Sequence, residues 1–135
     1  MAQIPIATAG ELEVVESREQ HTAVCNVDIA AGEIVRQDGT SAKWVKSLAT
    51  TAVNSNGSYM ATRSAKAGTA LTGLKKGVVR GFTLGAYGSK AYISDTAGEL
   101  ADAAGTVSVI AGDVIGQFGE VIGTAPAKLL RVDLP

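Results

Sequence analysis

The sequence predicts an all-β fold, a small β-barrel or sandwich of short strands with Gly turns, an extended N-terminal arm and room for one short helix. Short runs that alternate polar and apolar residues, such as Thr106–Ile110, predict half-buried strands. A unit of Ala-Gly, a polar residue and an apolar residue recurs between such runs, and its glycine permits a turn. The irregular spacing of this unit excludes a solenoid or propeller repeat. Its copies begin at Ala9, Ala31, Ala67, Ala97, Ala104 and Ala111.

The chain of 135 residues is long enough for one domain with its own core. Residues 1–9 are predicted to form the arm and residues 10–135 a single β-rich domain. The composition is 46% hydrophobic but only 4% aromatic, so Val, Ile, Leu and Ala must fill the core. Such a core is thin, and we therefore expect contacts with other subunits to add to its stability.

The first half of the domain is predicted to contain two strands and then a hairpin. The strands are Glu11–Ser17 and His21–Ile29, and the latter places Cys25 on one face with other apolar residues. The hairpin joins Gly32–Arg36 to Lys43–Lys46 around the Asp38-Gly39 turn. Residues 59–70 show no clear period and could hold the one short helix. The remaining predicted strands are Gly77–Leu84, Lys90–Ser94, Thr106–Ile110, Asp113–Phe118 and Lys128–Leu134.

The arm, Met1–Ala9, has two interpretations. It is either a free terminus or a strap that lies across an adjacent subunit and adds to its sheet edge. Ile4, Pro5 and Ile6 are apolar enough to dock, and Pro5 would prevent indiscriminate strand pairing.

Charge is distributed unevenly along a chain whose formal net charge is −1. This balance excludes a strongly basic nucleic-acid binder. Glutamates cluster near the N-terminus, whereas residues 40–94 contain bases and no acid. The pattern indicates either a solvated face or an acidic segment that meets a basic region on a neighbouring subunit or another protein. Candidate contacts in the basic region are Lys43, Lys75 and Lys76, together with Trp44, which is either a core anchor or an exposed contact.

The residues suited to catalysis or metal binding are few. His21 and Cys25, each the single residue of its type, would lie ~13 Å apart on a strand at ~3.3 Å per residue, too far for a nucleophilic pair. We expect a core-facing Cys25 and a surface His21. A calcium loop at Asp95, Glu99 and Asp102 would depart from the usual ligand spacing. We therefore predict no enzyme activity, catalytic residue, metal or cofactor.

Neither a membrane span nor a signal peptide is expected. No run approaches the ~20 apolar residues of a spanning helix. The first ten residues lack Lys and Arg, which a signal peptide would carry. A lone cysteine suits a reducing compartment. We therefore expect synthesis in a cytoplasm and no membrane partner.

The order of the turns and strands resembles the small capsid cement (decoration) proteins of bacteriophages. The resemblance covers roughly residues 8–134 and rests on segments that are weak individually but ordered as in that family. The segments are Ala30–Val35, Ala65–Ala70, Lys76–Phe82, Ala91–Gly98, Ala101–Ser108 and Leu130–Leu134.

This resemblance implies a structural protein of the virion, on the outer surface of the capsid. It would bind the major capsid protein between capsomers, often as a homotrimer, and stabilise the mature DNA-filled head without contacting nucleic acid directly. An alternative is a β-barrel ligand- or carbohydrate-binding module of a phage fibre or spike, although the chain has few aromatic residues for a sugar platform. A second alternative is an enzyme with a carboxylate pair assembled in space.

Overall fold

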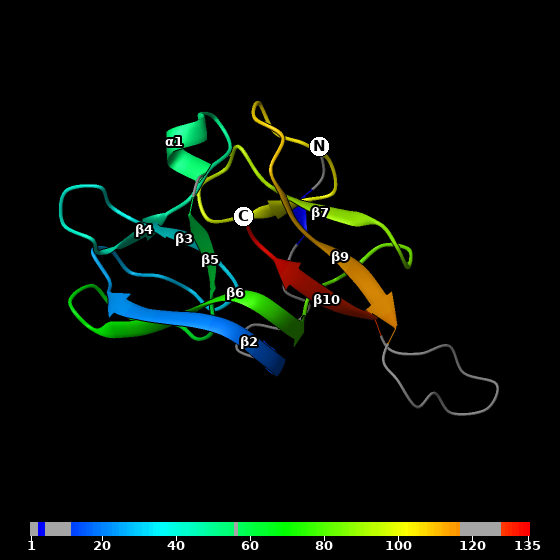
Figure 1. The fold of residues 1–135 in the computed structure, drawn as a ribbon, viewed down its shortest axis with the longest axis horizontal. Coiled ribbons are helices and arrows are strands. Elements are labelled where there is room, and N and C mark those ends of the chain that lie inside the picture. The colour runs from blue at the N-terminus through cyan, green and yellow to red at the C-terminus, as the bar shows by residue number, and fades with distance from the viewer. Residues whose placement is uncertain (1–2, 5–11, 56, 117–127) are drawn as a thin grey trace.

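The chain folds as an all-β domain with one short helix, and the computed structural model describes residues 3–4, 12–55, 57–116 and 128–135 (Figure 1). In chain order the elements are β1 (Gln3–Ile4), β2 (Glu13–Val24), β3 (Ile34–Gln37), β4 (Trp44–Lys46), α1 (Ala52–Ser55), β5 (Ser58–Ala61), β6 (Ala70–Arg80), β7 (Lys90–Ile93), β8 (Leu100–Ala101), β9 (Ile110–Gly116) and β10 (Lys128–Asp133).

All the named strands belong to one antiparallel sheet, which curls into a half-barrel. The strand order is β1-β8-β7-β9-β10-β6-β5-β3-β4, and β2 pairs with β6 outside this path. Backbone hydrogen bonds then connect the loop between β7 and β8 with β3 and with the residue that follows β4, across the open side of the curl. The amide of Ile34 donates to the carbonyl of Gly98 at 2.8 Å, and the amide of Gly98 donates to the carbonyl of Ser47 at 2.7 Å. The predicted small all-β architecture is therefore confirmed.

Two apolar clusters lie on opposite faces of the sheet around β3 and β5. The larger includes Ile34, Met60, Leu74 and Leu130. The smaller surrounds Trp44 and includes Val35. Because consecutive strand residues point to opposite faces, adjacent buried residues such as Ile34 and Val35 show that this part of the sheet is covered on both sides.

The hairpin predicted around Asp38-Gly39 is confirmed by the pairing of β3 with β4. The two strands predicted over Glu11–Ser17 and His21–Ile29 are instead one strand, β2, which begins at Glu13 and ends at Val24. Its register against β6 shifts at three places, all of them between Val14 and Gln20. Such irregularities break the alternation of side chains, which explains why the sequence pattern indicated two strands.

The prediction of a helix within residues 59–70 was wrong. The helix is α1, and residues 58–61 form strand β5 instead. The hydroxyl of Thr51 accepts a hydrogen bond from the amide of Asn54 at 3.2 Å, which is the geometry of a helix N-cap. Thr51 was therefore a usable signal for the helix start.

Two further strand boundaries differ from their predictions. Residues 106–109 lie outside the sheet, and β9 begins at Ile110. The amide of Val107 donates to the carbonyl of Ala49 at 2.7 Å, so Val107 is held by a loop, whereas the carbonyl of Val109 accepts from the amide of Ile93 of β7 at 2.9 Å. The strand predicted at Gly77–Leu84 is β6, which begins at Ala70 and ends before Gly81, whose φ is 120°.

Candidate functional site

The longest strand, β2, lies at an edge of the sheet. It pairs with β6 from Glu13 opposite Arg80 to Val24 opposite Ala70. Within the described part of the chain, β6 is the only named strand that pairs with it. Ten of its twelve residues are exposed, and only Val14 and Ala23 are partly buried. Both faces of β2 therefore meet solvent along most of its length, and Figure 1 shows it running beside β6 at one side of the molecule.

An exposed edge strand offers backbone donors and acceptors to a strand of another protein. Natural edges limit unwanted pairing with charged side chains and bulges. β2 has both devices, because it carries alternating charges at Glu16, Arg18 and Glu19 and its register against β6 is interrupted three times. Val15, 49% exposed, adds an apolar contact among these charges. The edge is thus open but selective in what it can pair with.

The acidic N-terminal segment meets the basic middle of the sequence within one chain. Glu13 and Arg80 stand opposite each other, and Nε of Arg80 donates to the Glu13 carboxylate at 2.8 Å. Glu19 stands opposite Lys76 in the same ladder, and Lys76 also forms an ion pair with Asp133 at 3.6 Å. Part of the charge asymmetry seen in the sequence is therefore neutralised between β2, β6 and β10.

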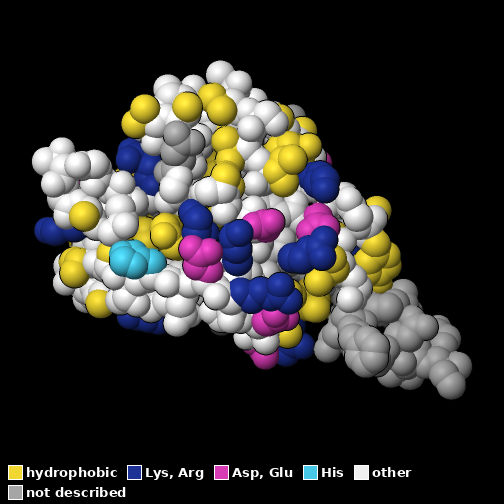
Figure 2. Space-filling model, in the orientation of Figure 1, with side chains coloured by type: hydrophobic (Ala, Val, Ile, Leu, Met, Phe, Trp, Pro, Cys, Tyr) yellow, Lys and Arg dark blue, Asp and Glu magenta, His cyan; other side chains and the backbone are white. Residues whose placement is uncertain are grey.

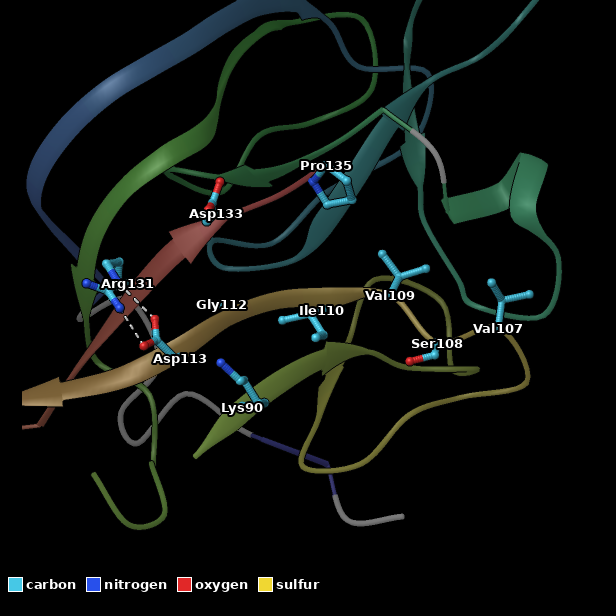
Figure 3. A pocket seen from close by; sticks show the side chains of 10 residues that line it. All are labelled: Lys90, Val107, Ser108, Val109, Ile110, Gly112, Asp113, Arg131, Asp133 and Pro135. Atoms are coloured by element: carbon cyan, nitrogen blue, oxygen red, sulfur yellow. Dashed lines mark hydrogen bonds and ion pairs between the residues drawn. The ribbon is translucent and has the colours of Figure 1, made fainter. Parts of the chain in front are cut away.

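Cross-strand ion pairs continue over β9 and β10. The guanidinium of Arg131 donates two hydrogen bonds to the carboxylate of Asp113, at 2.9 and 2.7 Å, and this contact raises the pKa of Arg131. Lys90 stands opposite Asp113 on the other side. These groups line an open groove of about 880 Å³ together with Ile110 (Figure 3). Figure 2 shows the charged side chains gathered over β6 and β10.

The predicted contact residues fall into different environments. Lys43 is exposed beside the hairpin turn. Trp44 is fully buried, and its indole N–H donates to the carbonyl of Leu71 at 2.7 Å. Of the two interpretations of Trp44, a core anchor is therefore the correct one. The ammonium of Lys75 lies 4.7 Å from the centroid of the Tyr59 ring and donates to the carbonyl of Pro135 at 2.9 Å.

The two residues of the expected arm that the structure describes lie in the chain's own sheet. Gln3 and Ile4 form β1, opposite Ala101 and Leu100 of β8. Ile4 is partly buried against the larger cluster. Pro5 and Ile6 lie outside the described residues.

His21 and Cys25 lie in different environments. His21 is exposed, and its ring centroid lies 6.0 Å from those of both Trp44 and Tyr59. Cys25 is 1% exposed, and burial raises the pKa of its thiol. The positions expected for both side chains are confirmed.

The candidate calcium loop is organised by hydrogen bonds to Asp95. This carboxylate accepts from the amide of Thr106 at 2.9 Å and from its hydroxyl at 2.8 Å. Among the described residues, no group of three or more His, Cys, Asp or Glu is placed to hold a metal ion. No helix in the described ranges has the length and apolarity needed to cross a bilayer.

A second hollow of about 760 Å³ lies between the loops that follow β2 and β5. Its floor includes Ile29 and Ala65, which bridge the two loops by paired backbone hydrogen bonds of 2.9 and 2.8 Å. At its rim Asp28 accepts from the amide of Ala67 at 2.9 Å and pairs with Lys66 at 3.5 Å. The amide of Ala67 and then the charge of Lys66 lower the pKa of Asp28. These contacts hold the two loops together. They account for the position of the Asp28 carboxylate, which needs no ligand to explain it.

Comparison with protein-family models and with curated proteins gives no match for this chain. Its function must therefore be argued from the residues and their arrangement. Sequence reasoning did not anticipate that one strand would be exposed on both faces. The signal was present in Glu13–Val24, where five charged or imidazole side chains interrupt the apolar positions.

Proposed function

We propose that this chain is a capsid cement protein of a bacteriophage. It binds the outer surface of the coat-protein lattice between capsomers and stabilises the mature DNA-filled head, as a homotrimer and without catalysis. The observation that supports it best is β2, a long edge strand with ten exposed residues, which suits lateral contact with another folded protein. The ordered resemblance of residues 8–134 to cement proteins supplies the identity of that partner.

Stabilisation by such a protein requires binding alone. A ligand that binds the mature lattice and not the immature one favours the mature state by mass action. A specific contact of this kind buries on the order of 800 Å² per partner. The many equivalent positions of a capsid repeat this contact, so a modest free energy per copy adds up over the shell.

The charges of β2 are suited to selecting the partner. Charges at an interface guide partner choice, and placing a charge opposite a like charge of the partner weakens binding. Arg18 lies between Glu16 and Glu19, and its Nε donates to the Glu16 carboxylate at 2.6 Å on an exposed surface. Exchanging charges along the edge should therefore disturb docking while leaving the buried core unchanged.

The fibre or spike module has less support. Exposed aromatic rings commonly form the platform on which sugars stack, and the single Trp of this chain is fully buried. Tyr59 is partly buried and is covered by Lys75, and Tyr87, which is 43% exposed, has the ammonium of Lys128 5.6 Å from its ring centroid.

The test is co-sedimentation of the purified protein with expanded capsids of the parent phage that lack it. We expect saturable binding by the wild-type chain. The double variant Arg18→Glu with Glu19→Arg keeps the net charge, and we expect it to bind at least about tenfold more weakly. Thr40→Glu, on the exposed hairpin turn, is the control and should bind like wild type. No binding of the wild-type chain would refute the proposed function, and equal binding of the edge variant would exclude β2 as the contact.

A further inference from the structure

Two segments of the chain carry no formally charged side chain. No Asp, Glu, Lys or Arg occurs in residues 47–62 or in residues 103–112. The fold brings these two segments together, since the amide of Val107 donates to the carbonyl of Ala49 at 2.7 Å. The glycine at 105 allows this approach, because a Cβ there would lie 2.9 Å from the Cβ of Ala49. We call the exposed part of residues 47–62 and 103–112 the charge-free surface.

The charge-free surface exposes apolar side chains. Val53 on α1 is 76% exposed, the highest value among the large hydrophobic side chains of the described residues, and Ile110 at the start of β9 is 44% exposed. Many other residues of these two segments are small or bear hydroxyl groups. Those that are exposed include Thr50, Ala103, Ala104 and Ser108. Figure 2 shows hydrophobic and uncharged atoms over α1, in contrast to the charged side chains over β6 and β10.

In the described part of the chain, several charged residues that adjoin this surface are already engaged. Arg36 donates to the side-chain oxygen of Asn54 at 3.2 Å. Asp95 accepts two hydrogen bonds from Thr106. Lys90 lies beside Ile110 in the groove of Figure 3, opposite Asp113 in the sheet. A partner that covers the charge-free surface would therefore desolvate few charges.

We infer that the charge-free surface is where copies of this chain contact one another. Close to a rotation axis, each residue of a subunit lies near the same residue of the neighbouring copies. A charged residue near the axis would face the same charge on the next subunit, and like charges at an interface cost several kcal/mol. A patch without charge avoids this repulsion, and depletion of charge is typical of interface cores. The β2–β6 side of the molecule carries many charged residues and is therefore less suited to contact with its own copies.

This inference deepens the proposed function and rests on its self-association. It assigns two surfaces to two partners, with the charge-free surface for other copies and the β2 edge for the coat protein. The two parts fail separately, because self-association is measured on the purified chain with no capsid present.

The experiment is sedimentation velocity of the purified full chain from about 1 to about 200 µM, in wild-type form and as Val53→Glu and Val53→Lys. We expect wild type to associate and each variant to shift toward monomer, with a dissociation constant raised at least about tenfold. Val15→Glu makes the same change at an exposed valine of β2 and should associate like wild type. Because Val53 is exposed, thermal unfolding midpoints of all the variants should match wild type at a dilution where wild type is itself monomeric, which separates lost association from lost folding.

Mixing V53E with V53K provides a second measurement. If like residues of neighbouring copies face each other, opposite charges now meet, and association should recover. Wild type that stays monomeric throughout, or variants that associate like wild type, would each overturn the inference, whereas stronger association of the mixture than of either variant alone would support it by placing Val53 beside its own copy. Variants that associate normally but lose binding to capsids would instead assign this surface to the coat protein.

Discussion

The backbone of Gly73 lies against the indole of Trp44, so that a Cβ built at Gly73 would be 3.2 Å from Cζ2 of the ring. The same Cβ would lie 2.7 Å from the Cβ of Tyr59. Gly73 stands opposite His21 in the β2–β6 ladder. The absence of a side chain at this position therefore allows the rings of Trp44 and Tyr59 to approach, with centroids 5.1 Å apart.

Replacing Gly73 with Ala should destabilise the fold, because the added methyl group meets a buried ring and another side chain. Overpacking of this kind costs about 1–3 kcal/mol. The measurement is the free energy of unfolding from urea titration. Gly39→Ala is the matched control, since a Cβ there meets nothing within 4 Å, and it should change stability by less than about 0.5 kcal/mol. Equal effects of the two changes would show that the contact at Gly73 is not tight.

Removing the Trp44 side chain should cost considerably more. The ring is 0% exposed and belongs to the smaller apolar cluster, so Trp44→Ala leaves a large cavity and an unpaired carbonyl at Leu71. We expect a loss of about 3–5 kcal/mol. In the wild-type chain, tryptophan fluorescence reports the same burial without mutation. Strong quenching of the native protein by acrylamide would contradict it.

The thiol of Cys25 should be unreactive in the folded protein. It is 1% exposed, and burial raises its pKa, so both access and the thiolate fraction are low. A chromogenic disulfide reagent at neutral pH should label it rapidly in denaturant and slowly under native conditions. Labelling of the native chain at the rate of an exposed free thiol would refute this prediction.

Two aspartates should make stability fall in acid. Hydrogen bonds from backbone amides, of Ala67 to Asp28 and of Ser41 and Thr40 to Asp38, lower both pKa values. A carboxylate whose pKa is lowered by folding stabilises the fold above its unfolded pKa of ~3.9 and loses that effect as pH falls through the lower folded value. The thermal midpoint of wild type should therefore drop below about pH 4.

The double variant Asp28→Asn with Asp38→Asn tests the source of that drop. Asn keeps an oxygen acceptor for the backbone amides but cannot titrate. We expect the midpoint of the variant to depend less on pH between neutral and acid than that of wild type. Identical pH profiles would show that other carboxylates cause the acid sensitivity.

The sequence allowed the fold class to be predicted because its turns and alternating runs are local signals. The Asp38-Gly39 hairpin and strand β7 follow from such signals. The single long strand β2 did not, since register shifts against β6 interrupt its alternation. Residues 106–109 look like a strand, but Asp95 and Ala49 accept hydrogen bonds from the amides of Thr106 and Val107 and hold these two residues outside the sheet. These partners are distant in sequence and no local pattern reveals them.

The candidate surfaces were predictable only in part. Lys43, Lys75 and Lys76 were expected to be available for contacts, yet the fold engages Lys75 with Tyr59 and Lys76 with Asp133. The absence of charge in residues 47–62 and 103–112 is visible in the sequence. That these segments form one surface depends on the contact between Val107 and Ala49, which only the folded chain provides.

The most direct test of the proposed cement function is the copy number of this chain relative to the major coat protein in purified particles of the parent phage. The proposal predicts a ratio near one per coat subunit, because a lattice-wide cement occupies every equivalent junction. A few copies per particle would indicate a fibre or vertex component, and absence of the chain from the particles would contradict a structural role in the virion.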